Sequence, residues 1–352
     1  MIQAYIDVEA LKSFFESKNH PNFKYCLEIF QTRVEMKFLF SEENIKEDEE
    51  LQMLMNQLSD GCDTPENYDY TSQNKNTFNN IPFSFIKNKY DKTNYPIKEL
   101  MSLFFINSIN TEDKLILHNL VWDKGNSILE KLSKLYYRDR QYYQQICRPS
   151  KLTNWDVFSQ YALPLTDIIL IDPYISSNKD RESFNIVPLI RNLCKNIHDT
   201  SINIIIFSEP RKDKSKNIIR LNRKEGTGII DDFSESKKLI EEALKSKRLT
   251  SINLTYIETE ELKEHDRTIF TNYCYYECAG SFSDIFKSNG ENVSNSRFFK
   301  VFSHLDPDNM EDSLYLLKDL QEVINSTKSL IKKDGQKRIW GCEESFFLNF
   351  KP

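Results

Sequence analysis

The chain has 352 residues, of which 39% are hydrophobic and 28% are charged, and its formal net charge is −6. This balance is typical of a globular chain, and the negative charge argues against binding polyanions through overall charge. No stretch approaches the roughly 20 apolar residues that a membrane span needs, and the first residues lack a signal-peptide pattern. We therefore expect a cytoplasmic protein of two domains, with the membrane excluded as a partner.

The first half predicts an N-terminal α/β domain of unassigned type over residues 1–125. Alternation and helical spacing predict strands over 1–7, 34–41 and 113–122, and helices over 8–18 and 45–61. Asp7 and Glu9, after the first strand, resemble the start of a PIN-like nuclease, but no further acids can be assigned to such a magnesium site.

Residues 126–162 predict a helical connector. Leucines at helical spacing predict a helix over 126–146, and Pro149 blocks its continuation.

The second half predicts a mixed sheet flanked by helices, because strand and helix patterns alternate along it. The apolar runs at 166–176 and 201–209 are typical of strands buried on both faces. The remaining expected elements are a strand over 252–259 and helices over 184–197, 234–249 and 309–333, with Ser234 as a helix N-cap.

The seven cysteines are scattered and odd in number, which is typical of reduced thiols. Cys274 and Cys278 lie four positions apart without a second Cys or His pair nearby. Buried thiols are therefore favoured over a zinc site, and we expect neither a metal nor another cofactor.

A short polar stretch carries the chemistry of the second half. His265 and Arg267 precede an apolar strand, and the pair Gly280-Ser281 follows it. An imidazole beside a guanidinium can attack or hold a phosphate, because the cation neutralises charge on the phosphate oxygens. Asn272 can hold an imidazole ring by a hydrogen bond but lacks the charge that would stabilise imidazolium.

This stretch resembles the phospholipase-D-like superfamily, whose enzymes carry H-x-K, an Asp five residues after the Lys, and a Gly-Ser turn. It is most similar to the phospholipase-D-like domain that ends the MIT-domain proteins. The matching residues are His265, Asp266, Arg267, Ile269, Asn272, Gly280, Asp284 and Phe286. A phospholipase-D-like domain is therefore expected over 163–307, followed by a C-terminal helix and tail over 308–352.

The resemblance implies a role for each matching residue. His265 would be the nucleophile and Arg267 the phosphate ligand, with Asn272 and Ser281 completing the site. The supporting residues are Asp266, Gly280, Asp284 and Asp172, which ends a buried strand and either orients the site or forms a simple turn.

The chain departs from the family in having a single H-x-[KR] motif of this pattern. Catalysis would therefore require a homodimer that brings two copies of His265 together; His304 is the other candidate imidazole. The first half does not resemble an MIT helical bundle, so the membrane function of that group is not carried over.

A basic segment follows the strand at 201–209, where open α/β sheets usually bind ligands. It can lie along nucleic acid, although a solvated loop is the alternative. Its basic residues are Arg211, Lys212, Lys214, Lys216, Arg220, Arg223 and Lys224.

The sequence thus predicts a bacterial, homodimeric protein that recognises phosphate groups, on nucleic acid, through a degenerate phospholipase-D-like site. By analogy, its setting is an anti-phage defence or mobile-element system, with a possible protein partner from the same operon. Two alternatives stay open: a metal-independent nuclease with His265 as nucleophile, and an adaptor between proteins.

Overall fold

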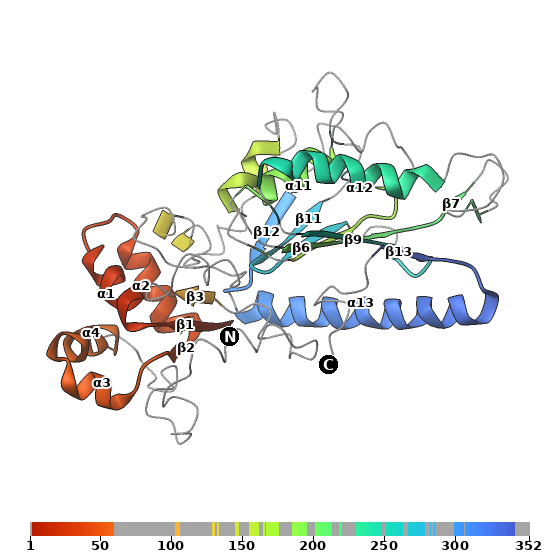
Figure 1. Cartoon of the computed structure of the whole chain (residues 1–352). Helices are drawn as coiled ribbons and strands as arrows, with labels where there is room; N and C mark the ends of the chain where they lie inside the picture. The colour runs from red at the N-terminus through yellow and green to blue at the C-terminus, as the bar shows by residue number, and fades with distance from the viewer. Residues whose placement is uncertain are drawn as a thin grey trace. The chain divides into compact units, whose positions relative to one another are not determined.

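Figure 1 shows the chain as a computed structural model. It describes residues 2–59, 103–105, 129–130, 132–133, 145–147, 155–161, 165, 167–175, 185–195, 201–212, 218–219, 230–247, 249, 251–262, 267–278, 282, 285, 299–305 and 307–341. The chain divides into two compact units. The first comprises Met1–Arg138, Ser303–Asp312 and Phe350–Pro352, and the second comprises Asp139–Phe302 and Ser313–Asn349.

The first unit contains a parallel sheet with strand order β2-β1-β3. Its strands are β1 (Ile2–Ile6), β2 (Val34–Phe38) and β3 (Leu103–Phe105), and β1 pairs in parallel with both others. The helices α1 (Val8–Glu16) and α2 (Phe23–Thr32) connect β1 to β2. Aromatic rings fill the space between these helices, with the Phe14 and Phe30 centroids 4.9 Å apart.

The helix predicted over 45–61 is two helices, α3 (Glu42–Glu47) and α4 (Glu49–Ser59). Asp48 separates them because its backbone is extended and its Oδ1 accepts the N–H of Leu51 at 3.0 Å, which caps α4. The helix α2 was not predicted at all. The strand predicted over 113–122 lies outside the described residues.

The second unit is built on a mixed sheet with strand order β13-β9-β6-β5-β10-β11-β12-β4. The strands β5, β6 and β9 are parallel, whereas β10 runs antiparallel to β5 and β13 runs antiparallel to β9. The strand bounds are β4 (Gln145–Cys147), β5 (Asp167–Ile171), β6 (Ser201–Ser208), β9 (Ser251–Glu258), β10 (Thr268–Thr271), β11 (Cys274–Cys278), β12 (Phe299–Ser303) and β13 (Ile339–Gly341).

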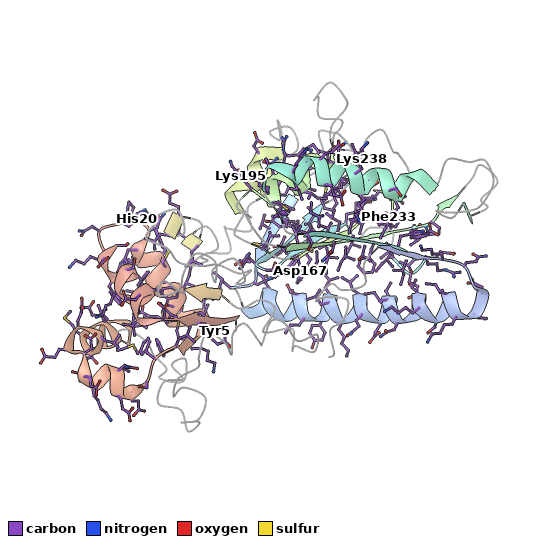
Figure 2. The ribbon with its side chains drawn as sticks, viewed as in Figure 1. Tyr5, His20, Asp167, Lys195, Phe233 and Lys238 are labelled. Atoms are coloured by element: carbon purple, nitrogen blue, oxygen red, sulfur yellow. The ribbon has the colours of Figure 1, made fainter. Side chains whose placement is uncertain are left out.

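Helices cover both faces of this sheet. Figure 1 shows α11 (Ile186–Leu193) and α12 (Ile230–Leu244) on one face and the long helix α13 (Pro307–Asp334) on the other. A buried stripe of Leu317, Leu320 and Ile324 marks one side of α13. On α12, Phe233 extends toward the sheet and Lys238 is exposed (Figure 2).

The predicted class of the second unit is confirmed: it is a mixed sheet flanked by helices. The helix predicted over 126–146 is wrong at its end, because Gln145–Cys147 pair with β12 as strand β4. Ser234 is not an N-cap either, since α12 begins earlier, at Ile230. Among the described helices, none is both long and apolar enough to cross a bilayer.

Candidate functional site

The structure describes part of the site that the sequence predicts. Arg267, Asn272 and Asp172 are described with their side chains, whereas Arg211 and Lys212 are described through their backbone only. The remaining predicted residues lie outside the described part of the chain: His265, Asp266, Gly280, Ser281, Asp284, Lys214, Lys216, Arg220, Arg223 and Lys224.

A row of polar residues crosses the second unit at the carboxyl ends of its parallel strands. Ser208 at the end of β6 pairs with Glu258 at the end of β9. The registers of the neighbouring strand pairs add three residues that lie just outside a strand. Asp172 follows β5, Arg267 precedes β10 and Arg338 precedes β13. Side chains of register partners share a face of the sheet. This carboxyl-edge row consists, in order, of Arg338, Glu258, Ser208, Asp172 and Arg267.

Asp172, fully buried at the end of β5, fixes two backbone segments. Its Oδ1 accepts a hydrogen bond from the N–H of Tyr174 at 2.9 Å, which closes a tight turn. Its Oδ2 accepts one from the N–H of Phe282 at 2.7 Å, the residue that follows Gly280-Ser281 in sequence. Such bonds offset much of the cost of burying a carboxylate. Asp172 thus forms a strand-end turn and also anchors the segment at Phe282.

Arg267 is the partly exposed member of the row. Its guanidinium lies over the ring of Tyr174, with Cζ 5.2 Å from the ring centroid, in a cation–π contact. Within the described part of the chain, its buried Nε has no hydrogen-bond partner and its guanidinium pairs with no carboxylate. Arg267 therefore forms no ion pair with any described acid.

Arg338, at the other end of the row, is engaged by acids of the chain. Its Nη1 donates to Oδ1 of Asp334 at 2.7 Å, and Nη2 donates to the other carboxylate oxygen. The hydrogen bonds with Asp334 raise the pKa of Arg338 above its ordinary value, and the charges of Glu258 and Glu260 add to this effect. The two arginines of the row thus differ: Arg338 forms an ion pair with Asp334, and Arg267 forms none with a described acid.

Asn272 lies at the opposite end of β10 from Arg267. Its Oδ1 accepts the N–H of Asp167 at 3.1 Å, and Asp167 accepts a bond from Nδ2 of Asn203 at 3.0 Å. Asn203 in turn accepts a bond from Nδ2 of Asn253 at 3.0 Å. Figure 2 labels Asp167 within this amino-edge ladder, as we call these four residues. At about 3.3 Å per residue, β10 holds Asn272 about 16 Å from Arg267, so the structure does not bring them together.

The basic segment begins at the same edge as the carboxyl-edge row. The strand β7 (Arg211–Lys212) starts three residues after β6 ends and pairs with β8 (Ile218–Ile219) as an antiparallel hairpin. Its backbone therefore leaves the sheet where the parallel strands end.

The other candidate residues have structural surroundings. Asp7 is buried as the N-cap of α1 and accepts the N–H of Ala10 at 2.7 Å, while Glu9 is exposed. His304 is buried. Cys274 and Cys278 are buried free thiols, and burial raises the pKa of Cys274. The described residues include no group of His, Cys, Asp and Glu side chains that could hold a metal ion.

Sequence reasoning missed four residues of this edge: Tyr174, Ser208, Glu258 and Arg338. A signal for Ser208 and Glu258 was present, since each is the polar residue that ends an apolar strand, as Asp172 does after β5. Arg338 carries no such signal, because its place depends on the pairing of β13 with β9. The phospholipase-D-like resemblance stays a prediction, since comparisons with models of protein families, with curated proteins and with solved structures find no match.

Proposed function

We propose that this protein recognises phosphate groups of nucleic acid at the Arg267 end of the carboxyl-edge row, through a degenerate phospholipase-D-like site. One observation carries the proposal: Arg267 is partly exposed and forms no ion pair with an acid among the described residues. An arginine without an acid partner keeps its positive charge available, and an incoming anion would supply the missing partner.

The chemistry of the neighbouring residues supports a phosphate as that anion. A guanidinium presents a planar fork that matches two phosphate oxygens. His265, two positions earlier in the sequence, would add a second donor. Asp172 would not repel the ligand strongly, because its two oxygens already accept hydrogen bonds from Tyr174 and Phe282.

The basic segment supports nucleic acid as the carrier of the phosphate. Its hairpin starts at the carboxyl end of β6, and its lysines and arginines would follow a repeating chain of phosphates. A homodimer in the cytoplasm would present two such sites along one strand.

Binding of fluorescent oligonucleotides in EDTA, followed by anisotropy at several salt concentrations, tests the proposal. We expect Arg267→Ala to weaken binding about tenfold to 100-fold and to reduce the salt slope by about one, because one charged phosphate contact is lost. Arg191→Ala is the matched control, since Arg191 is an exposed arginine on α11. Its loss should leave affinity unchanged.

Two results would decide against the proposal as stated. Equal affinities of Arg267→Ala and the wild type would remove phosphate recognition at this edge. Cleavage of the oligonucleotide in EDTA that disappears in His265→Ala would replace the binding protein with a metal-independent phosphodiesterase.

A further inference from the structure

Tyr174 is an aromatic side chain that is exposed and yet held in place. It is 39% exposed, whereas its neighbours Pro173 and Ile175 are buried. Its backbone N–H is bound to the Asp172 carboxylate at 2.9 Å. The N–H of Glu209 donates to the Pro173 carbonyl oxygen at 3.2 Å, which ties the same turn to the end of β6. The ring is therefore presented to solvent on a backbone that cannot easily move away.

The ring and the Arg267 cation form one surface. The Cζ atom of Arg267 lies 5.2 Å from the ring centroid, and no described carboxylate competes for the guanidinium. A cation over an aromatic ring loses rotamer freedom before any ligand arrives, which lowers the entropy cost of binding. A ligand at Arg267 must therefore lie beside Tyr174.

We infer that Tyr174 stacks on a nucleobase while Arg267 holds a neighbouring phosphate, so that the ligand is unpaired nucleic acid. This inference rests on the proposed function and names the substrate class of the same site. Each nucleotide carries both a planar base and a phosphate, and exposed aromatic rings in single-strand-binding proteins stack on bases of any sequence.

A base can reach Tyr174 only where it is not already paired and stacked within a duplex. The expected ligand is therefore a single strand and not a double helix. A lipid phosphate or inorganic phosphate would use Arg267 but would have nothing to place on the ring.

A purely supporting role for Tyr174 makes a different prediction. If the ring only held Arg267 in place, its removal would weaken every phosphate ligand by the same factor, whether or not the ligand carries bases. Stacking affects only ligands that carry bases. A comparison of oligonucleotides with and without bases separates the two roles.

The experiment uses the full chain and two fluorescent oligonucleotides of about ten nucleotides, one of thymidines and one of abasic sites with the same charge. We expect Tyr174→Ala to weaken binding of the thymidine strand about fivefold to 100-fold and to leave binding of the abasic strand unchanged. Tyr174→Phe keeps the ring and should bind both as the wild type does. Tyr25→Ala, at an exposed tyrosine of the first unit, is the matched control.

Other results of this experiment would overturn either stacking by Tyr174 or the proposed function. An equal loss of both strands in Tyr174→Ala, or no loss of either, would overturn stacking and leave phosphate recognition by Arg267 standing. Binding of the abasic strand as tightly as the thymidine strand by the wild type would also overturn it. If the wild type binds neither strand, the proposed function itself fails. The melting temperature of each variant shows whether it is folded.

Discussion

The carboxylate of Asp172 accepts a hydrogen bond from the backbone N–H of Phe282 at 2.7 Å, across 110 positions of the chain. Because the same carboxylate binds the N–H of Tyr174, the turn that presents Tyr174 and the segment after Gly280-Ser281 share one anchor. Loosening either bond should therefore affect both segments.

We expect Asp172→Asn to lower the free energy of unfolding by about 1–3 kcal/mol, because an amide has a single acceptor oxygen and leaves one buried N–H unpaired. Oligonucleotide affinity should fall as well, since the turn that holds Tyr174 borders Arg267. Urea unfolding and anisotropy measure the two effects. Asp319→Asn, at an exposed position on α13, should change the stability by less than about 0.5 kcal/mol. A variant at Asp172 as stable as this control would refute the anchor.

The amino-edge ladder should affect stability without affecting binding. Asn203→Ala removes the donor to Asp167 and the acceptor of Asn253, so we expect a loss of about 1–3 kcal/mol in urea unfolding. Oligonucleotide affinity at a temperature where the variant is folded should match the wild type, because the ladder lies at the far end of the strands. Arg267→Ala should show the reverse pattern. A clear loss of affinity in Asn203→Ala would place the ligand elsewhere on the sheet.

Gly341 is a position where the fold requires glycine. Its φ is +100°, and an added Cβ would lie 1.8 Å from the carbonyl oxygen of Leu254. Gly341→Ala should therefore lower the free energy of unfolding by more than about 2 kcal/mol. Gly335 also has a positive φ, of 69°, but open space around it, so Gly335→Ala should cost only about 1–2 kcal/mol. Urea unfolding of both variants gives the order, and a larger effect at Gly335 would contradict the close approach.

Buried thiols should make the protein less stable in alkali. Burial raises the pKa of Cys26 from its ordinary value of 9.0 to about 12, and it also raises those of Cys194 and Cys274. A thiol whose pKa is raised in the folded state contributes its full stabilisation of the fold at pH values below its ordinary pKa. That contribution is lost as the pH rises toward the pKa of the folded state. Each such thiol should cost about 1.4 kcal/mol per pH unit above about pH 9.

The difference between the wild type and Cys26→Ala isolates the contribution of that thiol. Urea unfolding at about pH 8 and pH 10.5 should show the stability gap between the two proteins narrowing as the pH rises. A gap that does not change with pH would mean that Cys26 ionises equally in the folded and unfolded chains.

The sequence predicted the buried strands of the second unit better than it predicted the end of the helix over 126–146. The short apolar run at 201–209 is rich in β-branched isoleucine, which favours a strand buried on both faces, and β6 confirms that prediction. The end of the helix predicted over 126–146 was missed because pairing with β12 overrides local helical spacing at Gln145–Cys147.

The sequence predicted part of the candidate site. Chemistry and strand position predict Asp172 and Arg267 as site residues, and the pairing of β10 with β5 brings both to one edge. The resemblance to the phospholipase-D-like motif predicts Asn272 as a site residue, but the length of β10 places it at the other edge of the sheet. Arg338 could not be found, because register between distant segments is a property of the folded sheet and not of any local window.

The short strand β13 has a consequence for how the protein behaves among copies of itself. It pairs with residues 255–257 along the outer side of β9 and covers peptide groups there that would otherwise be open. Deletion of residues 335–341 would remove Arg338 and would also expose the edge of β9, with which a strand of another chain could pair. The deletion variant should self-associate as its concentration rises, and light scattering would detect this even if its helices remain folded.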